Sequence, residues 1–144
     1  MEAAKIMLKL KKEDYEKILD HCRKGLPNES CGLLGGTIEG DVKTIEKVYL
    51  LTNIDESNEH FSMDPKEQLK AIKDARANGY KIIGNFHSHP ESPSRPSEEY
   101  KRLAFDPAIE YLILSLMEEG NPVLKAFGID KEKNVTIHEI EITE

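Results

Sequence analysis

The feature that most constrains the fold is an unbroken apolar run, "IEYLILSLM", at residues 109–117. A run of this kind is typical of a strand that is buried on both faces, and so predicts a central strand of a sheet. Two further strands are predicted after it, "PVLKAFGID" and "NVTIHEIEI", joined by a turn near Asp130 and Lys131. The C-terminal third of the chain is therefore expected to consist mainly of β-structure.

The rest of the chain alternates predicted helices with predicted strands. Helical spacing and terminal signals place helices near residues 13–25, 65–78 and 97–105, the second with Asp64 as N-cap and Pro65 in its first turn. Strands are predicted in "IMLKL", on both sides of a hairpin turn at residues 39–41, in "HFSM" and in "KIIGNFHSH". We therefore predict one α/β domain over residues 1–144, with a curved mixed sheet and about three packed helices.

Composition excludes several classes of function. Twenty basic and 27 acidic residues give a formal charge of −7, which argues against a sequence-independent nucleic-acid binder. No apolar stretch approaches the ~20 residues of a membrane helix, and the first ten residues lack the apolar run of a secretory signal. These features predict a cytoplasmic protein, in which Cys22 and Cys31 are reduced thiols.

Two histidines at the end of a predicted strand are the first candidates for chemistry. His87 and His89 are two positions apart, so on a strand their side chains point to the same face. Two imidazoles on one face can bind one zinc ion, and a catalytic zinc site leaves one position open for water. An isolated His-x-His pair is also common on protein surfaces, so the pair alone does not establish a metal site.

Two nearby residues could take part in the same reaction. Ser97 follows His89 by eight residues at the start of a predicted helix, where its hydroxyl could cap the helix or face a developing oxyanion. Glu29, in "PNESCGLLGG", could act as a general base, although an isolated glutamate is more often a solvated loop acid. Cys31 is expected to be a core thiol, not a nucleophile.

Several segments together resemble the JAMM (MPN-plus) metalloprotease family, of the short prokaryotic single-domain type, over almost the whole chain. The similar segments are "PNESCGLLGG", "TNIDESNEHFSMDP", "GYKIIGNFHSHPESPSRPSEEY" and "EYLILSLM". The resemblance implies a fold like that of cytidine deaminases. It also implies hydrolysis of a peptide or isopeptide bond after the C-terminal glycine of a ubiquitin-like or sulfur-carrier protein.

The resemblance also implies a role for each matching residue. His87 and His89 match two zinc ligands, Glu29 matches the general base, and Ser97 matches the hydroxyl that stabilises the tetrahedral intermediate. A deaminase is excluded, because that class needs a Cys-x-x-Cys motif that this chain does not contain. The remaining alternative is a non-catalytic scaffold that binds ubiquitin-like proteins.

The chain departs from the family pattern at Tyr100, which stands where the family has its third ligand, an aspartate. A phenol with a pKa near 10 is a poor zinc ligand at neutral pH. Three explanations are open. Glu99 or Glu98 replaces the ligand, zinc binds through two histidines and water, or the protein binds no zinc and acts as a scaffold. Because both histidines, Glu29 and Ser97 are present, we favour a weakened metal site.

Remaining residues have simpler expectations. His21 and His138 are predicted to face solvent, and His60 is expected to lie outside the site. Glu91 and Arg95 are predicted to lie in a loop over the site and to contact substrate.

Overall fold

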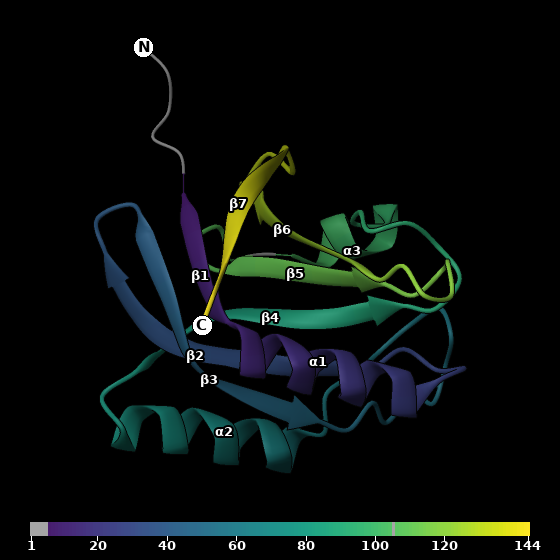
Figure 1. Ribbon diagram of the computed structural model, residues 1–144, viewed down its shortest axis with the longest axis horizontal. Helices are drawn as coiled ribbons and strands as arrows, with labels where there is room; N and C mark the ends of the chain where they lie inside the picture. The colour runs from purple at the N-terminus through teal and green to yellow at the C-terminus, as the bar shows by residue number, and fades with distance from the viewer. Residues whose placement is uncertain (1–5, 105) are drawn as a thin grey trace.

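The computed structural model describes residues 6–104 and 106–144 of the chain. Its elements, shown in Figure 1, are β1 (Met7–Lys11), α1 (Lys12–Gly25), β2 (Cys31–Glu39), β3 (Val42–Leu51), α2 (Pro65–Ala77), β4 (Lys81–His89), α3 (Glu98–Leu103), β5 (Glu110–Ser115), β6 (Val123–Ile129) and β7 (Val135–Thr143). The predicted helices are confirmed to within one or two residues, except that residue 105, the predicted end of the third, lies outside the described residues.

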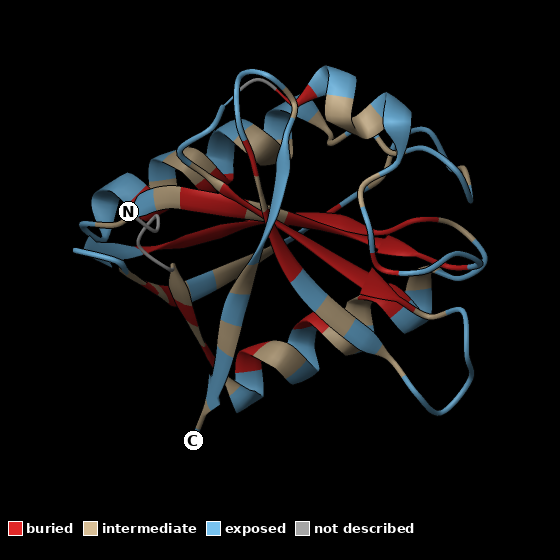
Figure 2. Cartoon of the chain, turned by 90° about the horizontal axis from the view of Figure 1, so that it is seen from above, coloured by how far each residue is buried: buried red, intermediate tan, exposed pale blue. Residues whose placement is uncertain are grey.

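All seven strands belong to one closed, mixed sheet in the order β1-β3-β2-β4-β5-β6-β7. The pairs β1–β3, β1–β7 and β4–β5 are parallel, and the others are antiparallel. β4 and β5 lie at the middle of this order, as the apolar run at residues 109–117 predicts. All six residues of β5 are buried. Figure 2 shows this buried centre in red.

Helix α1 covers one face of the sheet. Ile18 and Cys22 are fully buried there and join the largest hydrophobic cluster, which also contains Leu8, Phe86 and Leu114. The helix has acidic residues in its first turn and basic residues in its last, the arrangement that its dipole favours. The apolar spacing of the sequence therefore places α1 correctly.

Helices α2 and α3 pack against strand residues that lie outside the α1 cluster. Ala71 of α2 packs with Cys31 and Leu33 of β2, while Ala104, after α3, packs with Tyr111 and Ile113 of β5. The side chain of Asp64 caps α2 by accepting a hydrogen bond from the backbone nitrogen of Lys66 at 2.9 Å. The predicted N-cap is thus confirmed.

Three expectations from the sequence are wrong. "HFSM" forms no strand, only an isolated bridge between Asn53 and Met63. His21 does not face solvent freely, because its Nε2 lies 3.0 Å from the carbonyl oxygen of Leu51. His138 is also mostly buried, with Nδ1 2.5 Å from a carboxylate oxygen of Glu110.

That carboxylate belongs to a buried polar cluster. Lys43 donates to Glu110 at 2.7 Å and to the carbonyl oxygen of Ala108 at 2.8 Å. Lys43 and Glu110 are both buried, so each charge depends on the other for compensation. Among residues 6–104 and 106–144, no helix has the length and apolar character needed to cross a membrane.

Candidate active site

The two histidines of the sequence motif lie side by side at the end of β4. This strand runs between β2 and β5, where His87 is opposite Cys31 and next to Ile113. The Nε2 atoms of His87 and His89 are 3.1 Å apart. His89 Nδ1 lies 2.8 Å from the carbonyl oxygen of Pro93, which can only accept, so Nδ1 carries the proton and Nε2 keeps its lone pair. The expected convergence of both imidazoles is confirmed.

Burial favours the neutral form of both imidazoles. His87 is 2% exposed, and burial, followed by the proximity of His89, holds its pKa well below the ordinary value. Burial also lowers the pKa of His89, against the opposing effect of the Pro93 carbonyl. Both rings are therefore neutral at neutral pH, which is the form that binds metal ions.

Glu29 lies just before β2 and is fixed through its backbone. Its nitrogen donates to the carbonyl oxygen of Ser57 at 2.7 Å, and its carbonyl oxygen accepts from Asn53 Nδ2 at 2.9 Å. The backbone nitrogen of the next residue, Ser30, donates to Ser88 Oγ at 2.8 Å. Ser88 is the residue between the two histidines in the sequence. These bonds fix the start of β2 against the end of β4 and so bring Glu29 close to the histidine pair.

The carboxyl group of Glu29 favours its protonated form. Glu29 is 6% exposed, and burial, with smaller contributions from Glu59 and Glu99, raises its pKa to about 8. A carboxyl group with a pKa near the working pH suits general acid–base chemistry, because it can both accept and release a proton. The solvated loop acid considered as an alternative does not describe this buried side chain.

Ser97 has the capping role considered in the sequence analysis. Its Oγ accepts a hydrogen bond from the backbone nitrogen of Tyr100 at 3.1 Å and so caps α3. The hydroxyl proton is not used by this bond. Ser97 also lines the same hollow as Glu29 and the histidines, so both predicted roles are compatible with its position.

Tyr100 turns its hydroxyl group away from the histidines. The hydroxyl donates to Asn85 Oδ1 at 2.8 Å, and burial raises the pKa of the phenol further above its ordinary value. The tyrosine ring instead packs on the ring of His87, with the two centroids 4.6 Å apart. Phe61 stacks on the same imidazole at 4.7 Å. Tyr100 therefore contributes an aromatic wall to the site and no ligand.

The residues present fit a zinc ion in part. Two nitrogens bound to a tetrahedral zinc at about 2.0–2.1 Å lie about 3.3 Å apart, close to the spacing of the two Nε2 atoms. However, the described part of the chain contains no group of three His, Cys, Asp or Glu side chains arranged to hold a metal ion. The imidazole pair thus fits two zinc ligands, and the described residues place no third beside it.

The predicted site residues gather around one hollow of about 720 Å³, which we call the acidic hollow. It is lined by Glu29, Asp55, Ser57, Asn58, Glu59, His60, Phe61, Ser62, His87, His89, Glu91, Ser92, Ser97, Glu99, Tyr100 and Leu103. His60, expected outside the site, lines the hollow, and its Nδ1 lies 3.1 Å from Glu99 Oε2. Glu98 lies elsewhere, paired with Lys101.

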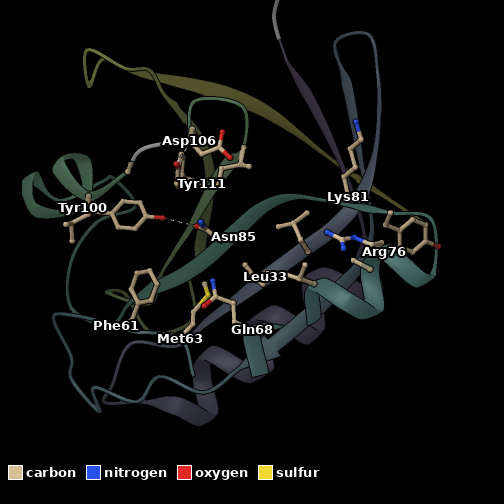
Figure 3. Close-up of a pocket in the computed structure, with 17 residues that line it drawn as sticks. Leu33, Phe61, Met63, Gln68, Arg76, Lys81, Asn85, Tyr100, Asp106 and Tyr111 are labelled. Carbon is tan, nitrogen blue, oxygen red and sulfur yellow. Dashed lines mark hydrogen bonds between the residues drawn. The ribbon is translucent and has the colours of Figure 1, made fainter. Parts of the chain in front are cut away.

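A second hollow, which we call the apolar hollow, meets the first at Tyr100. It has a volume of about 790 Å³, and its lining includes Leu33, Met63 and Ile72. Figure 3 shows Tyr100 and Phe61 at one end, the hydrogen bond to Asn85, and Arg76 and Lys81 at the other. The aromatic pair therefore stands between the two hollows. Arg95, predicted to lie over the site, borders a third hollow, which shares His89 and Ser97 with the acidic hollow.

Two asparagines are important and were not singled out from the sequence. Asn53 binds the backbone of Glu29, His60, Asp55 and Ser62. It thereby folds residues 53–62 over the site. Asn85 lies two positions before His87 on the same strand face, which is the signal that could have identified it as the partner of Tyr100.

The sequence matches a known protein family over most of its length. Residues 11–129 match the family of prokaryotic homologs of the JAB domain. The chain belongs to this family. The resemblance stated from the sequence motifs is therefore confirmed.

The chain is also similar to curated proteins and to proteins of solved structure. A desampylase from Haloferax volcanii is 32% identical over 75% of this chain and 80% of its own length. A CysO-cysteine peptidase from Mycobacterium tuberculosis is 29% identical over 76% of this chain and 73% of its own. A Desulfitobacterium hafniense protein of known solution structure is 56% identical, with a TM-score of 0.88, over 96% of this chain and 94% of its own.

Proposed function

We propose that this protein is a peptidase that hydrolyses the bond after the C-terminal glycine of a ubiquitin-like or sulfur-carrier protein. Membership of the JAB-domain family and similarity to a desampylase and a CysO-cysteine peptidase support this activity. The observation that carries the proposal is the convergence of a buried carboxyl group, two neutral imidazoles and a free hydroxyl proton on one hollow.

We further propose that zinc is the cofactor and that His87 and His89 hold it. When bound, zinc supplies a Lewis acid that polarises the scissile carbonyl and acidifies water. The hydrogen bond from His89 to Pro93 orients one imidazole for this role, as partners outside the metal site commonly do. The missing third ligand predicts a weaker affinity for zinc than a site with a carboxylate would have.

Glu29 is proposed as the general base. Its carboxylate takes a proton from the attacking water and then gives that proton to the leaving nitrogen. The raised pKa supports both halves of this cycle, since the carboxyl group releases the proton as readily as it accepts it near neutral pH. Ser97 is proposed to donate its hydroxyl proton to the oxygen that becomes negative in the tetrahedral intermediate.

Tyr100 supports a second candidate function. A scaffold that binds ubiquitin-like proteins without cleaving them would need no third ligand, and the phenol is bonded to Asn85 instead of facing the imidazoles. The buried carboxyl group of Glu29, which has no hydrogen-bond or ion-pair partner among residues 6–104 and 106–144, favours the enzyme, because a scaffold gains nothing from the desolvation of that group.

Zinc content separates the two functions. The protein is purified without chelator, and metal is measured per chain in wild type, His87→Ala and His21→Ala, a histidine that does not line the acidic hollow. The enzyme predicts zinc in wild type and His21→Ala and its loss in His87→Ala. Absence of zinc from all three, even after incubation with zinc salts, would favour the scaffold.

A further inference from the structure

The third hollow, of about 700 Å³, borders the candidate active site and has no role in the mechanism proposed above. It shares His89, Ser92 and Ser97 with the acidic hollow, so a substrate whose reacting bond lies at His89 and Ser97 can extend into both. Its other walls come from the loop after β4, from α3, and from β6 and β7. They are Pro93, Arg95, Pro96, Glu98, Lys101, Phe127, Val135 and Ile137.

The third hollow and the acidic hollow differ in charge. The third hollow contains Arg95, Lys101 and one acid, Glu98, whose carboxylate lies 2.7 Å from the Lys101 ammonium group. The side chain of Arg95 makes no hydrogen bond or ion pair within residues 6–104 and 106–144. Five carboxylate side chains and no described lysine or arginine line the acidic hollow. An anionic group on a bound substrate is therefore attracted by the third hollow and repelled by the acidic hollow.

Arg95 belongs to a loop that is attached to the candidate zinc ligands. Its backbone nitrogen donates to the carbonyl oxygen of Pro93 at 3.0 Å, and the same oxygen accepts from His89 Nδ1 at 2.8 Å. The buried Ser94 donates from its hydroxyl to the carbonyl oxygen of Ile113 at 2.7 Å. Arg95 lies close enough to His89 for its positive charge to lower the pKa of that imidazole, an effect smaller than that of burial. The backbone that carries this cation is thus fixed beside the reacting centre.

Apolar side chains lie across the third hollow from this loop. Val135 and Ile137 are two positions apart on β7 and so point to the same face of the strand. They are 38% and 65% exposed, and Phe127 of β6, the direct cross-strand partner of Ile137, lines the hollow beside them. The hollow thus suits a ligand that combines an anionic group with a short apolar side chain. An amino-acid residue with a free α-carboxylate has both.

We propose that Arg95 binds the free α-carboxylate of the residue that follows the scissile glycine, so that the enzyme favours release of a single C-terminal residue. This inference rests on the proposed function and specifies its leaving group. The guanidinium group can donate two parallel hydrogen bonds to such a carboxylate. Hydrolysis adds the hydroxyl group of water to the glycine carbonyl and a proton to the nitrogen of the released residue.

The geometry of the leaving group separates two kinds of linkage. In a residue joined through its α-nitrogen, the carboxylate carbon lies about 2.5 Å from the scissile nitrogen. A lysine joined through its side-chain nitrogen presents only its four-carbon stem at that distance, and no anion. Arg95 therefore favours an α-linked terminal residue over a lysine in an isopeptide bond.

The test compares three substrates made from one ubiquitin-like protein that ends in Gly-Gly. The first carries a C-terminal valine with a free carboxylate, the second carries valine amide, and the third is joined to the side-chain nitrogen of Nα-acetyl-lysine amide. Intact mass measures cleavage after the second glycine by the zinc-treated full chain, and gives kcat/KM at about 50 mM salt, where charges are weakly screened. The variants are Arg95→Gln, Arg95→Lys and a control, Lys125→Gln, an exposed cation of β6 that does not line the third hollow. Circular dichroism checks that each variant is folded.

We expect wild type to cleave the valine substrate with a kcat/KM about fivefold above that for valine amide or the lysine-linked substrate. The difference should lie mainly in KM, since the carboxylate is bound before the reaction begins. The preference should disappear in Arg95→Gln, fall to about twofold in Arg95→Lys, and persist in Lys125→Gln.

The same substrates distinguish failure of this inference from failure of the proposed function. Equal cleavage of all three substrates by wild type, at the bond after the second glycine, would leave the proposed function standing and overturn the inference. A preference that Arg95→Gln retains, or that Lys125→Gln also loses, would overturn it as well. Cleavage of none of them would refute both.

Discussion

Glu29 carries a carboxyl group whose ionisation the fold disfavours, so replacing it with glutamine should stabilise the metal-free protein at neutral pH. The raised pKa means that the folded state holds a proton that the unfolded state loses between about pH 4.5 and 8. The free energy of unfolding of wild type should therefore fall as pH rises through this window and be level on either side of it.

The size of the effect follows from the same pKa. Each pH unit in the window is worth about 1.4 kcal/mol, which gives a ceiling of about 3 kcal/mol at pH 7. Because the carboxyl group borders a hollow that water can enter, we expect about 1–2 kcal/mol. Glutamine keeps the shape of the side chain and cannot ionise, so Glu29→Gln removes this cost.

Urea denaturation with chelator present, at pH 5, 6, 7 and 8, measures the effect. The control is Glu119→Gln, which changes an exposed acid outside the acidic hollow. The free energy of unfolding of wild type and of this control should fall together as pH rises. That of Glu29→Gln should stay nearly constant, so that this variant is the most stable of the three at pH 8. If the three curves run parallel, the carboxyl group of Glu29 is not held in its protonated form, and the argument for its role as an adjustable base is refuted.

Further variants test the third-ligand position and the buried polar cluster. Tyr100→Asp should raise the affinity for zinc at least tenfold in a competitive chelator titration, because an ionised carboxylate would then bind the metal together with the two imidazoles. If Glu99→Gln abolishes zinc binding and Tyr100→Asp does not change it, Glu99 is the third ligand instead. Lys43→Met should lower the free energy of unfolding by about 3–5 kcal/mol, since it leaves Glu110 charged and buried. Equal stability of Lys43→Met and wild type in urea would contradict that account.

Much of the fold could be predicted because local signals agree with the tertiary structure. Asp64 caps α2, Gly40 has the positive φ of 62° that the predicted hairpin turn requires, and the apolar run at residues 109–117 yields a fully buried strand. Each signal depends on neighbours in sequence. Closure of the sheet by pairing of β1 with β7 depends on residues more than a hundred positions apart, and no local pattern encodes it.

The failed expectations have the same physical origin. "HFSM" has the composition of a short strand, but Asn53 takes up its backbone groups through side-chain hydrogen bonds. His138 belongs to a strand whose alternation leaves most side chains exposed, yet Glu110 provides it with a buried partner. Long-range partners override local patterns in both cases.

The site could be predicted in part. The spacing of His87 and His89 places both imidazoles on one face, and the family resemblance associates them with Glu29 and Ser97. The sequence also shows that Tyr100 breaks the pattern. The sequence does not show that the Tyr100 hydroxyl turns to Asn85. Nor does it show that acids from separate loops gather in one hollow that no described lysine or arginine lines, because both features depend on how residues 53–62 fold over β4.

The most direct test of the central claim is the mass of the product formed from a defined substrate. A ubiquitin-like protein is fused through its C-terminal Gly-Gly to a short peptide and incubated with zinc-treated wild type, Glu29→Gln and Glu119→Gln. We predict two fragments whose intact masses place the cut directly after the second glycine, formed by wild type and Glu119→Gln but not by Glu29→Gln. No cleavage by wild type, or a cut at another bond, would contradict the account.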